Sequence, residues 1–148
     1  MALNFNQFAA EANEFLKEYD KELMLDGDSD KAGRILSSIL HGLREVIPTE
    51  ESLQLLAQLP MFLKAVYVNG WSKRKTKKVK NMNEFVDLIR DFDGITSMHD
   101  FSSYELAIQY IHTTFLLLSR YISSGELNDI KSSLPKDLKA IVYHKIMI

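Results

Sequence analysis

Residues 49–67 read TEESLQLLAQLPMFLKAVY, and residues 124–142 repeat the pattern as SGELNDIKSSLPKDLKAIV. The two stretches lie 75 positions apart, and the match includes a Leu-Pro pair and a Leu-Lys-Ala triplet. A match of this length indicates an internal duplication, so the whole chain can be compared with itself in search of a repeated fold.

The Leu-Pro pairs predict a sharp corner in each copy. Proline disfavours helical geometry in the residue before it, so a short helix should end at Leu59 and at Leu134. Proline also suits the first turn of a helix, and we therefore expect Pro60 and Pro135 to lie in the first turn of the next one. Each leucine side chain is then placed to seal the corner.

The start of each repeated stretch carries signals for a helix N-terminus. Thr49 and Ser124 align as N-cap candidates, each expected to contribute about 1 kcal/mol relative to alanine. Glu51 and Glu126 also align and fall in the first turn, where the helix dipole favours negative charge. The pattern predicts two matched short helices.

Farther toward the N-terminus, a second match starts each half of the chain. Asn4 is followed three residues later by Gln7, and Asn81 by Glu84. This is the spacing of a capping box, in which the two side chains satisfy free amides at the start of a helix. A helix should therefore begin after each asparagine.

Residues 28–46 carry apolar side chains at intervals of three and four, as expected for one face of a helix. Gly33 and Gly42 lie at the edges of this stripe, where the second copy has Ile108 and Leu117. We expect the glycines to permit close approach of a neighbouring helix. The wider stripe predicts that the later helix is the more deeply buried.

The fourth helix should end at Asn69-Gly70, because glycine readily takes the left-handed conformation that terminates helices. Trp71 would then fold back onto the last turn. No stretch alternates apolar and polar residues for long enough to predict a strand.

These signals predict an all-α protein. We expect an eight-helix bundle made of two tandem four-helix repeats, related by an approximate two-fold, in one compact domain that spans 1–148. The first repeat covers 4–71, a basic linker covers 72–80, and the second repeat covers 81–148.

The corners and helix ends described above belong to a longer ordered set of residues, namely Ala57-Gln58-Leu59-Pro60, Leu63, Gly70-Trp71, Glu84-Phe85, Gly125-Glu126, Asp129, Leu134-Pro135 and Leu138. With this set, the sequence resembles the bacterial family known as domain of unknown function 2267. The resemblance covers nearly the whole chain and implies a helical tandem-repeat fold in bacteria, without an established activity or catalytic residues.

The composition restricts the possible chemistry and location. The 148 residues include no cysteine, which excludes disulfides, thiolate nucleophiles and sulfur-ligated metals. The N-terminus lacks the pattern of a secretory signal, and the longest apolar run is far shorter than the ~20 residues of a membrane span. We expect a soluble, cytoplasmic protein.

The linker concentrates positive charge in a chain whose net charge is −2. Such a segment can bind nucleic acid, an anionic membrane surface or an acidic partner, with an adjacent aromatic ring for stacking. It can equally be a solvated connection between two acidic halves. Contact of all six cations with duplex DNA would give a log-log salt slope of about −5. The candidate anion-binding residues are Lys73, Arg74, Lys75, Lys77, Lys78, Lys80 and Trp71.

The familiar motifs of metal and nucleotide sites are not found. Residues 26–37 begin like a calcium loop, but Lys31 replaces the required glycine and Ser37 the final glutamate. Asp28 or Asp30 more simply caps the following helix. We find no HExxH, Walker or nucleophile-elbow motif, and we predict no cofactor and no catalytic or metal residues.

The sequence therefore favours a non-enzymatic interaction or scaffold protein of the bacterial cytoplasm, with a protein partner. A nucleic-acid-associated protein that uses the linker is the alternative, and an enzyme of unrecognised type is third. A groove between the repeats, able to take a peptide helix or an apolar ligand, stays open.

Overall fold

The computed structural model describes residues 4–72 and 78–142, and within these ranges the chain is helical without a strand. The prediction of an all-α protein with eight helices is confirmed. The helices are α1 (Phe5–Glu22), α2 (Ser29–Val46), α3 (Thr49–Gln58), α4 (Met61–Val68), α5 (Met82–Asp93), α6 (Ser97–Asp100), α7 (Tyr104–Leu118) and α8 (Ser124–Ser133), with 3-10 segments η1 (Gly94–Thr96) and η2 (Lys136–Ile141).

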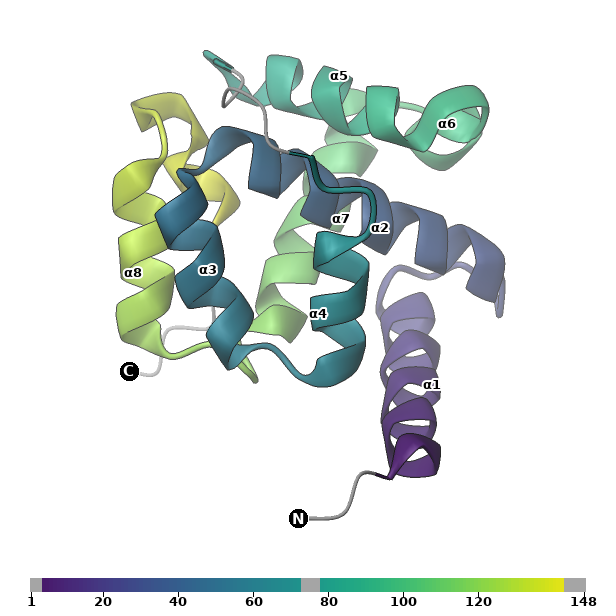
Figure 1. Ribbon diagram of the computed structural model, residues 1–148. Coiled ribbons are helices and arrows are strands. Elements are labelled where there is room, and N and C mark those ends of the chain that lie inside the picture. The colour runs from purple at the N-terminus through teal and green to yellow at the C-terminus, as the bar shows by residue number, and fades with distance from the viewer. Residues whose placement is uncertain (1–3, 73–77, 143–148) are drawn as a thin grey trace, which may run out of the picture.

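Helix α2 is the element around which the others pack. It contacts α1, α4, α5, α6 and α7, and Figure 1 shows it running through the body beneath α5. Its buried residues extend beyond the apolar stripe to Arg44 and Glu45. The prediction that the later helix is more deeply buried was therefore wrong. Leu117 is buried, but Ile108, at the other edge of the α7 stripe, is only half-buried.

One of the two glycines in α2 provides the expected close approach. A Cβ on Gly42 would lie 2.8 Å from Cγ1 of Ile89, so α5 packs directly against the backbone there. A Cβ on Gly33 would meet nothing within 4 Å. The two glycines differ because only Gly42 faces a crossing helix.

The two halves of the chain contain similar elements in similar contacts. Helices α3 and α8 have bounds that are 75 positions apart, and η2 begins 75 positions after α4. Helix α1 contacts α2 and α4, much as α5 contacts α7 and η2. The second half differs in having η2 instead of a fourth α-helix and in carrying α6. The duplication itself stays a prediction from the sequence.

The predicted asparagine caps are present. Oδ1 of Asn4 accepts a hydrogen bond from the amide of Gln7, and Oδ1 of Asn81 accepts one from Glu84. The return bond of a capping box differs from the prediction, because the Glu84 carboxylate accepts from the amide of Lys80, one residue before the cap.

The N-cap predictions for Thr49 and Ser124 were wrong by one residue. Pro48 and Ser123 occupy the cap positions with extended backbone, and the following residue is already helical. Oγ of Ser123 accepts a hydrogen bond from the amide of Glu126, whereas Pro48 offers no side-chain cap. Of these two helix starts, only that of α8 therefore has a capping hydroxyl.

The Leu-Pro corners form as two extended residues between helices. Leu59 and Leu134 are buried, and each is the C-cap of the helix before it. Pro60 and Pro135 are the caps of the next elements rather than first-turn residues, which corrects the prediction by one position. An extended ψ at the proline turns the chain before the new helix begins.

Two other helix ends agree with the sequence. Gly70 has a φ of +70° after α4, and the Trp71 ring packs edge-on against Tyr67 at 5.8 Å. Oδ1 of Asp28 accepts from the amide of Lys31 and caps α2. Among the described residues, no helix is both long and apolar enough to cross a membrane.

Candidate functional site

The predicted anion-binding segment lies largely outside the described residues. Within them, Lys78 and Lys80 are exposed and Val79 between them is buried. Trp71 is half-buried against Tyr67, so its ring acts as part of the helix end. The predicted residues that fall outside the described ranges are Lys73, Arg74, Lys75 and Lys77.

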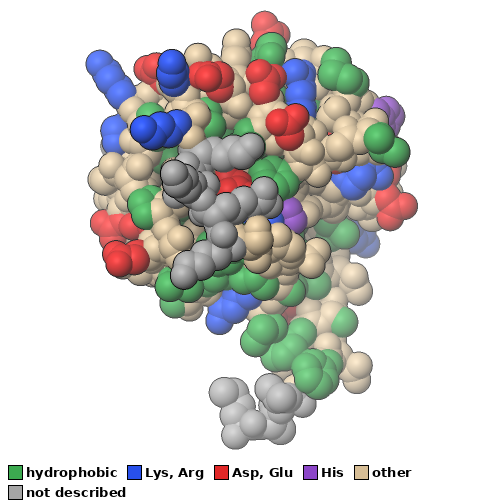
Figure 2. Space-filling view, turned by 45° about the horizontal axis from the view of Figure 1, so that its top comes forward, with side chains coloured by type: hydrophobic (Ala, Val, Ile, Leu, Met, Phe, Trp, Pro, Cys, Tyr) green, Lys and Arg blue, Asp and Glu red, His purple; other side chains and the backbone are tan. Residues whose placement is uncertain are grey.

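The charges on one described face of the molecule are mixed in sign. Figure 2 shows lysine and arginine side chains interspersed with aspartate and glutamate on the face that it presents. The described part of that face therefore forms no continuous basic surface.

A concave hollow lies between α1, α2 and α4. It has a volume of about 590 Å³ and is predominantly apolar. Gly33 leaves room at one side because it has no side chain there. The residues that line the hollow are Ala12, Phe15, Leu16, Gly33, Leu36, Ser37, Phe62, Ala65, Val66 and Asn69.

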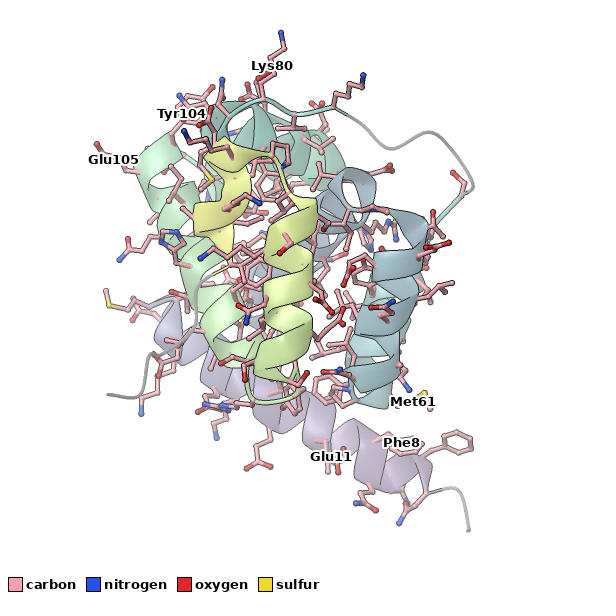
Figure 3. The ribbon with its side chains drawn as sticks, turned by 90° about the vertical axis from the view of Figure 1, so that its left-hand side faces the viewer. Phe8, Glu11, Met61, Lys80, Tyr104 and Glu105 are labelled. Carbon is pink, nitrogen blue, oxygen red and sulfur yellow. The ribbon has the colours of Figure 1, made fainter. Side chains whose placement is uncertain are left out.

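A second hollow of about 320 Å³ adjoins the first and shares Phe15 and Phe62 with it. Its polar lining comes mainly from glutamates on the outer face of α1, and Figure 3 shows Glu11 on this part of the helix. Together the two hollows form what we call the α1 groove, an apolar surface with an acidic border. The second hollow is lined by Glu11, Glu14, Phe15, Glu18, Pro60, Phe62, Arg120 and Tyr121.

An aromatic cluster forms the floor where the hollows meet. The ring of Phe62 lies 5.4 Å from that of Phe15 and 6.3 Å from that of Tyr121. Below them, Tyr19 is fully buried, and its hydroxyl lies 2.6 Å from Oγ1 of Thr114. The floor is thus fixed by contacts between α1, α4 and the end of α7.

One end of the groove is closed by an ion pair between distant parts of the chain. The guanidinium of Arg120 donates two hydrogen bonds to the Glu18 carboxylate. This contact lowers the pKa of Glu18, so the pair stays ionised at neutral pH. Glu11 and Glu14, both exposed, supply the remaining negative charge of the border.

A separate polar cluster joins α2 to α6. Arg34 donates to both oxygens of Asp100, at 2.8 and 3.0 Å, although Asp100 is fully buried. Burial and the neighbouring Asp100 raise the pKa of Asp93 to about 6, while Thr96 donates to Asp93. These groups lie on helix contacts away from the α1 groove, and we interpret them as structural.

The described histidines are not gathered in one place. Nε2 of His41 donates to the carbonyl of Val66, and Nε2 of His112 to that of Ala140. His99 is exposed on α6. His144 lies outside the described residues.

The sequence left open whether a groove lies between the halves, and the α1 groove lies between them only in part. The smaller hollow contains Arg120 and Tyr121 from the second half, but the larger one is formed only by the first half. Sequence reasoning missed the role of Phe15 and Phe62 because helical periodicity marks both simply as apolar positions.

Comparison with protein families gives a match over residues 12–141 to a model described as an uncharacterised conserved protein, DUF2267. A comparison with curated proteins gives no match. The matched range includes every residue of the α1 groove except Glu11.

Proposed function

We propose that this chain, which belongs to the DUF2267 family of uncharacterised conserved proteins, is an interaction module that binds a helical segment of a partner protein. The observation that carries the proposal is the α1 groove, with its apolar floor and acidic border. Grooves of this kind accept the apolar face of an amphipathic helix.

The charge of the groove indicates the chemistry of the partner. Glu11 and Glu14 are exposed on the border, and residues 1–70 together carry 6 basic and 11 acidic side chains. A partner helix with lysine or arginine beside its apolar stripe would be attracted to this border and oriented by it. The proposed ligand is therefore a basic amphipathic helix.

The groove offers apolar surface that the fold leaves open. Ala65 is exposed on α4, and Phe62 and Val66 are half-buried beside it. Two or three apolar side chains of a partner would cover these atoms, and burial gains roughly 25 cal/mol per Å² of apolar surface. The aromatic floor provides the rigid anchor surface that is typical of binding hot spots.

The proposal places this interaction in the cytoplasm of a bacterium. It is supported by the absence of cysteine from the sequence, which suits a reducing compartment, and by the bacterial family that the motifs resemble. Binding of nucleic acid through the linker stays a prediction, and its test is the salt slope of about −5.

The test of the groove is selection from a displayed library of helical peptides, followed by fluorescence anisotropy of an enriched peptide. We expect enriched peptides to combine an apolar stripe with lysine or arginine. Ala65→Arg should weaken binding at least about tenfold, because it places a cation and a long side chain in the groove.

Ala57→Arg is the matched control, since Ala57 is exposed on α3 outside the groove. It should leave the affinity unchanged. Failure to enrich basic amphipathic peptides, or equal binding by Ala65→Arg and the unaltered protein, would contradict the proposed function.

A further inference from the structure

The contact between α3 and α8 brings three carboxylates together. Glu51 lies in the first turn of α3, Glu126 in the first turn of α8, and Asp129 one turn later. The two helices lie side by side in Figures 1 and 3. One carboxylate oxygen from each residue lies within 4.8 Å of the other two.

Two of these carboxylates have a buried oxygen without a hydrogen-bond partner in the described part of the chain. Glu126 is 6% exposed, and its Oε1 has no hydrogen-bond partner among the described residues. Oε1 of Glu51 is also buried and has no hydrogen-bond partner among the described residues. Because a buried ionised carboxylate is costly without a compensating charge or donor, the cluster calls for a bound cation or a retained proton.

We propose that Glu51, Glu126 and Asp129 bind a hard divalent cation of the Mg²⁺, Mn²⁺ or Ca²⁺ class, which links α3 to α8. An all-oxygen, anionic set of ligands suits these ions and disfavours metals that prefer nitrogen or sulfur. Oxygens bound to one such ion are about 3 Å apart when they are adjacent and up to about 5.2 Å apart when they are opposite, so the spacing here needs only small side-chain adjustments.

The surroundings provide a route for the ion. Asp129 is exposed and Glu51 is half-buried, so the cluster opens to solvent on the side of Asp129. The ion would keep water on that side, as magnesium and calcium usually do in protein sites. The buried Glu126 carboxylate would then contact the inner side of the ion.

The position of the site gives it a structural role. Glu51 and Glu126 are 75 positions apart and occupy matching turns, so the cation would connect equivalent helices of the two halves. An ion that binds only the folded state raises its stability. The site uses none of the helices that form the α1 groove, so its test is independent of the proposed function.

The experiment is calorimetric titration of EDTA-treated, dialysed full-length protein with CaCl₂, MgCl₂ and MnCl₂ at pH 7.5, together with the melting temperature Tm. We expect one ion per chain for at least one metal, and a rise in Tm with its concentration. Glu126→Gln and Glu51→Gln, which keep the side-chain shape, should lower the affinity at least about tenfold.

Asp129→Asn should also weaken binding, and it tests the site without altering a buried residue. Glu50→Gln, at the exposed neighbour of Glu51, is the matched control and should bind as the unaltered protein does. Binding weaker than about 1 mM for all three metals would overturn the proposal, since that is the weak limit of protein calcium sites. Equal affinity in Asp129→Asn and the unaltered protein would overturn it as well, and the carboxylates would then share only a proton.

Discussion

The pKa of a buried carboxyl group in this protein depends on the group that it contacts, and not on whether the residue is aspartate or glutamate. The buried Asp100 receives two hydrogen bonds from Arg34, and its pKa lies below the ordinary value despite burial. The buried Glu126 faces Glu51 instead, and burial together with that neighbour raises its pKa to about 7. One residue is held as an anion, whereas the other retains a proton near neutrality in the absence of a cation.

The raised pKa of Glu126 predicts a specific pH dependence of stability. In EDTA, the folded protein holds this proton up to about pH 7, whereas the unfolded chain releases it near the ordinary value of 4.5. The unfolding free energy must therefore fall as the pH rises through this interval. The quantity to measure is the Tm of the unaltered protein minus that of Glu126→Gln, which should decrease from pH 5 to pH 8.

The comparison with Glu126→Gln removes the other groups that titrate in this range. Burial lowers the pKa of His41, which adds stability with rising pH, and Asp93, with its pKa of about 6, acts in the opposite direction. Both are present in the two proteins and cancel. A difference in Tm that does not change with pH would mean that the pKa of Glu126 is the same in the folded and unfolded states.

At the scale of helices and turns, the sequence predicted most of the helix caps and helix ends, because these depend on nearby side chains. The asparagine caps, the cap at Asp28 and the glycine end of α4 follow from side chains within three residues of the backbone that they affect. The helix starts were displaced by one residue at Thr49 and Ser124. At both starts the preceding residue, Pro48 or Ser123, takes the extended backbone of the cap position. The alignment of the two halves did not show which of the two neighbouring residues would be the cap.

The contacts between helices could not be predicted from nearby residues in the same way. Periodicity identified the apolar face of α2, but not that α5 crosses it at Gly42 while Gly33 borders a hollow. The α1 groove and the carboxylate cluster both depend on which helices meet. Glu51 and Glu126 were recognised only as first-turn residues, although their alignment by the repeat was the signal that relates them.

The two glycines of α2 give a paired prediction. Gly33→Ala should stabilise the protein by about 0.5–1 kcal/mol, because alanine favours the helix and its Cβ meets nothing. Gly42→Ala should destabilise it, because overpacking against Ile89 costs about 1–3 kcal/mol and outweighs the same helix preference. Urea unfolding measures both, and equal effects would show that α5 is not held against α2.

The Leu-Pro corners give a second prediction at this scale. Leu59→Ala and Leu134→Ala should each cost about 2–5 kcal/mol, because each removes a buried side chain from the core and leaves a cavity. Leu53→Ala is the control, since Leu53 is 57% exposed on α3 and should change stability by less than about 0.5 kcal/mol. If the corner variants matched this control, the leucines would not seal the corners.

At the scale of the whole molecule, the two halves share one core. A single buried cluster includes residues from Phe15 in α1 to Val142 just after η2. It includes contacts that cross the middle of the chain, such as Phe85 and Ile89 packing at Gly42. A half of the chain in isolation would expose the surfaces that α2 and α3 now bury against α5, α7 and α8.

This shared core predicts that the protein unfolds in one cooperative transition, as expected for a single domain over 1–148. Scanning calorimetry should give a single peak with an unfolding enthalpy of about 100 kcal/mol near 60 °C, and equal calorimetric and van't Hoff enthalpies. Two separable peaks, or a calorimetric enthalpy about twice the van't Hoff value, would show that the halves fold independently.

The variant Gly42→Ala makes this test more specific, because its added Cβ disturbs the contact between α2 and α5. In a single domain, the variant must lower the Tm of the only peak. In independent halves, a second peak would keep its position.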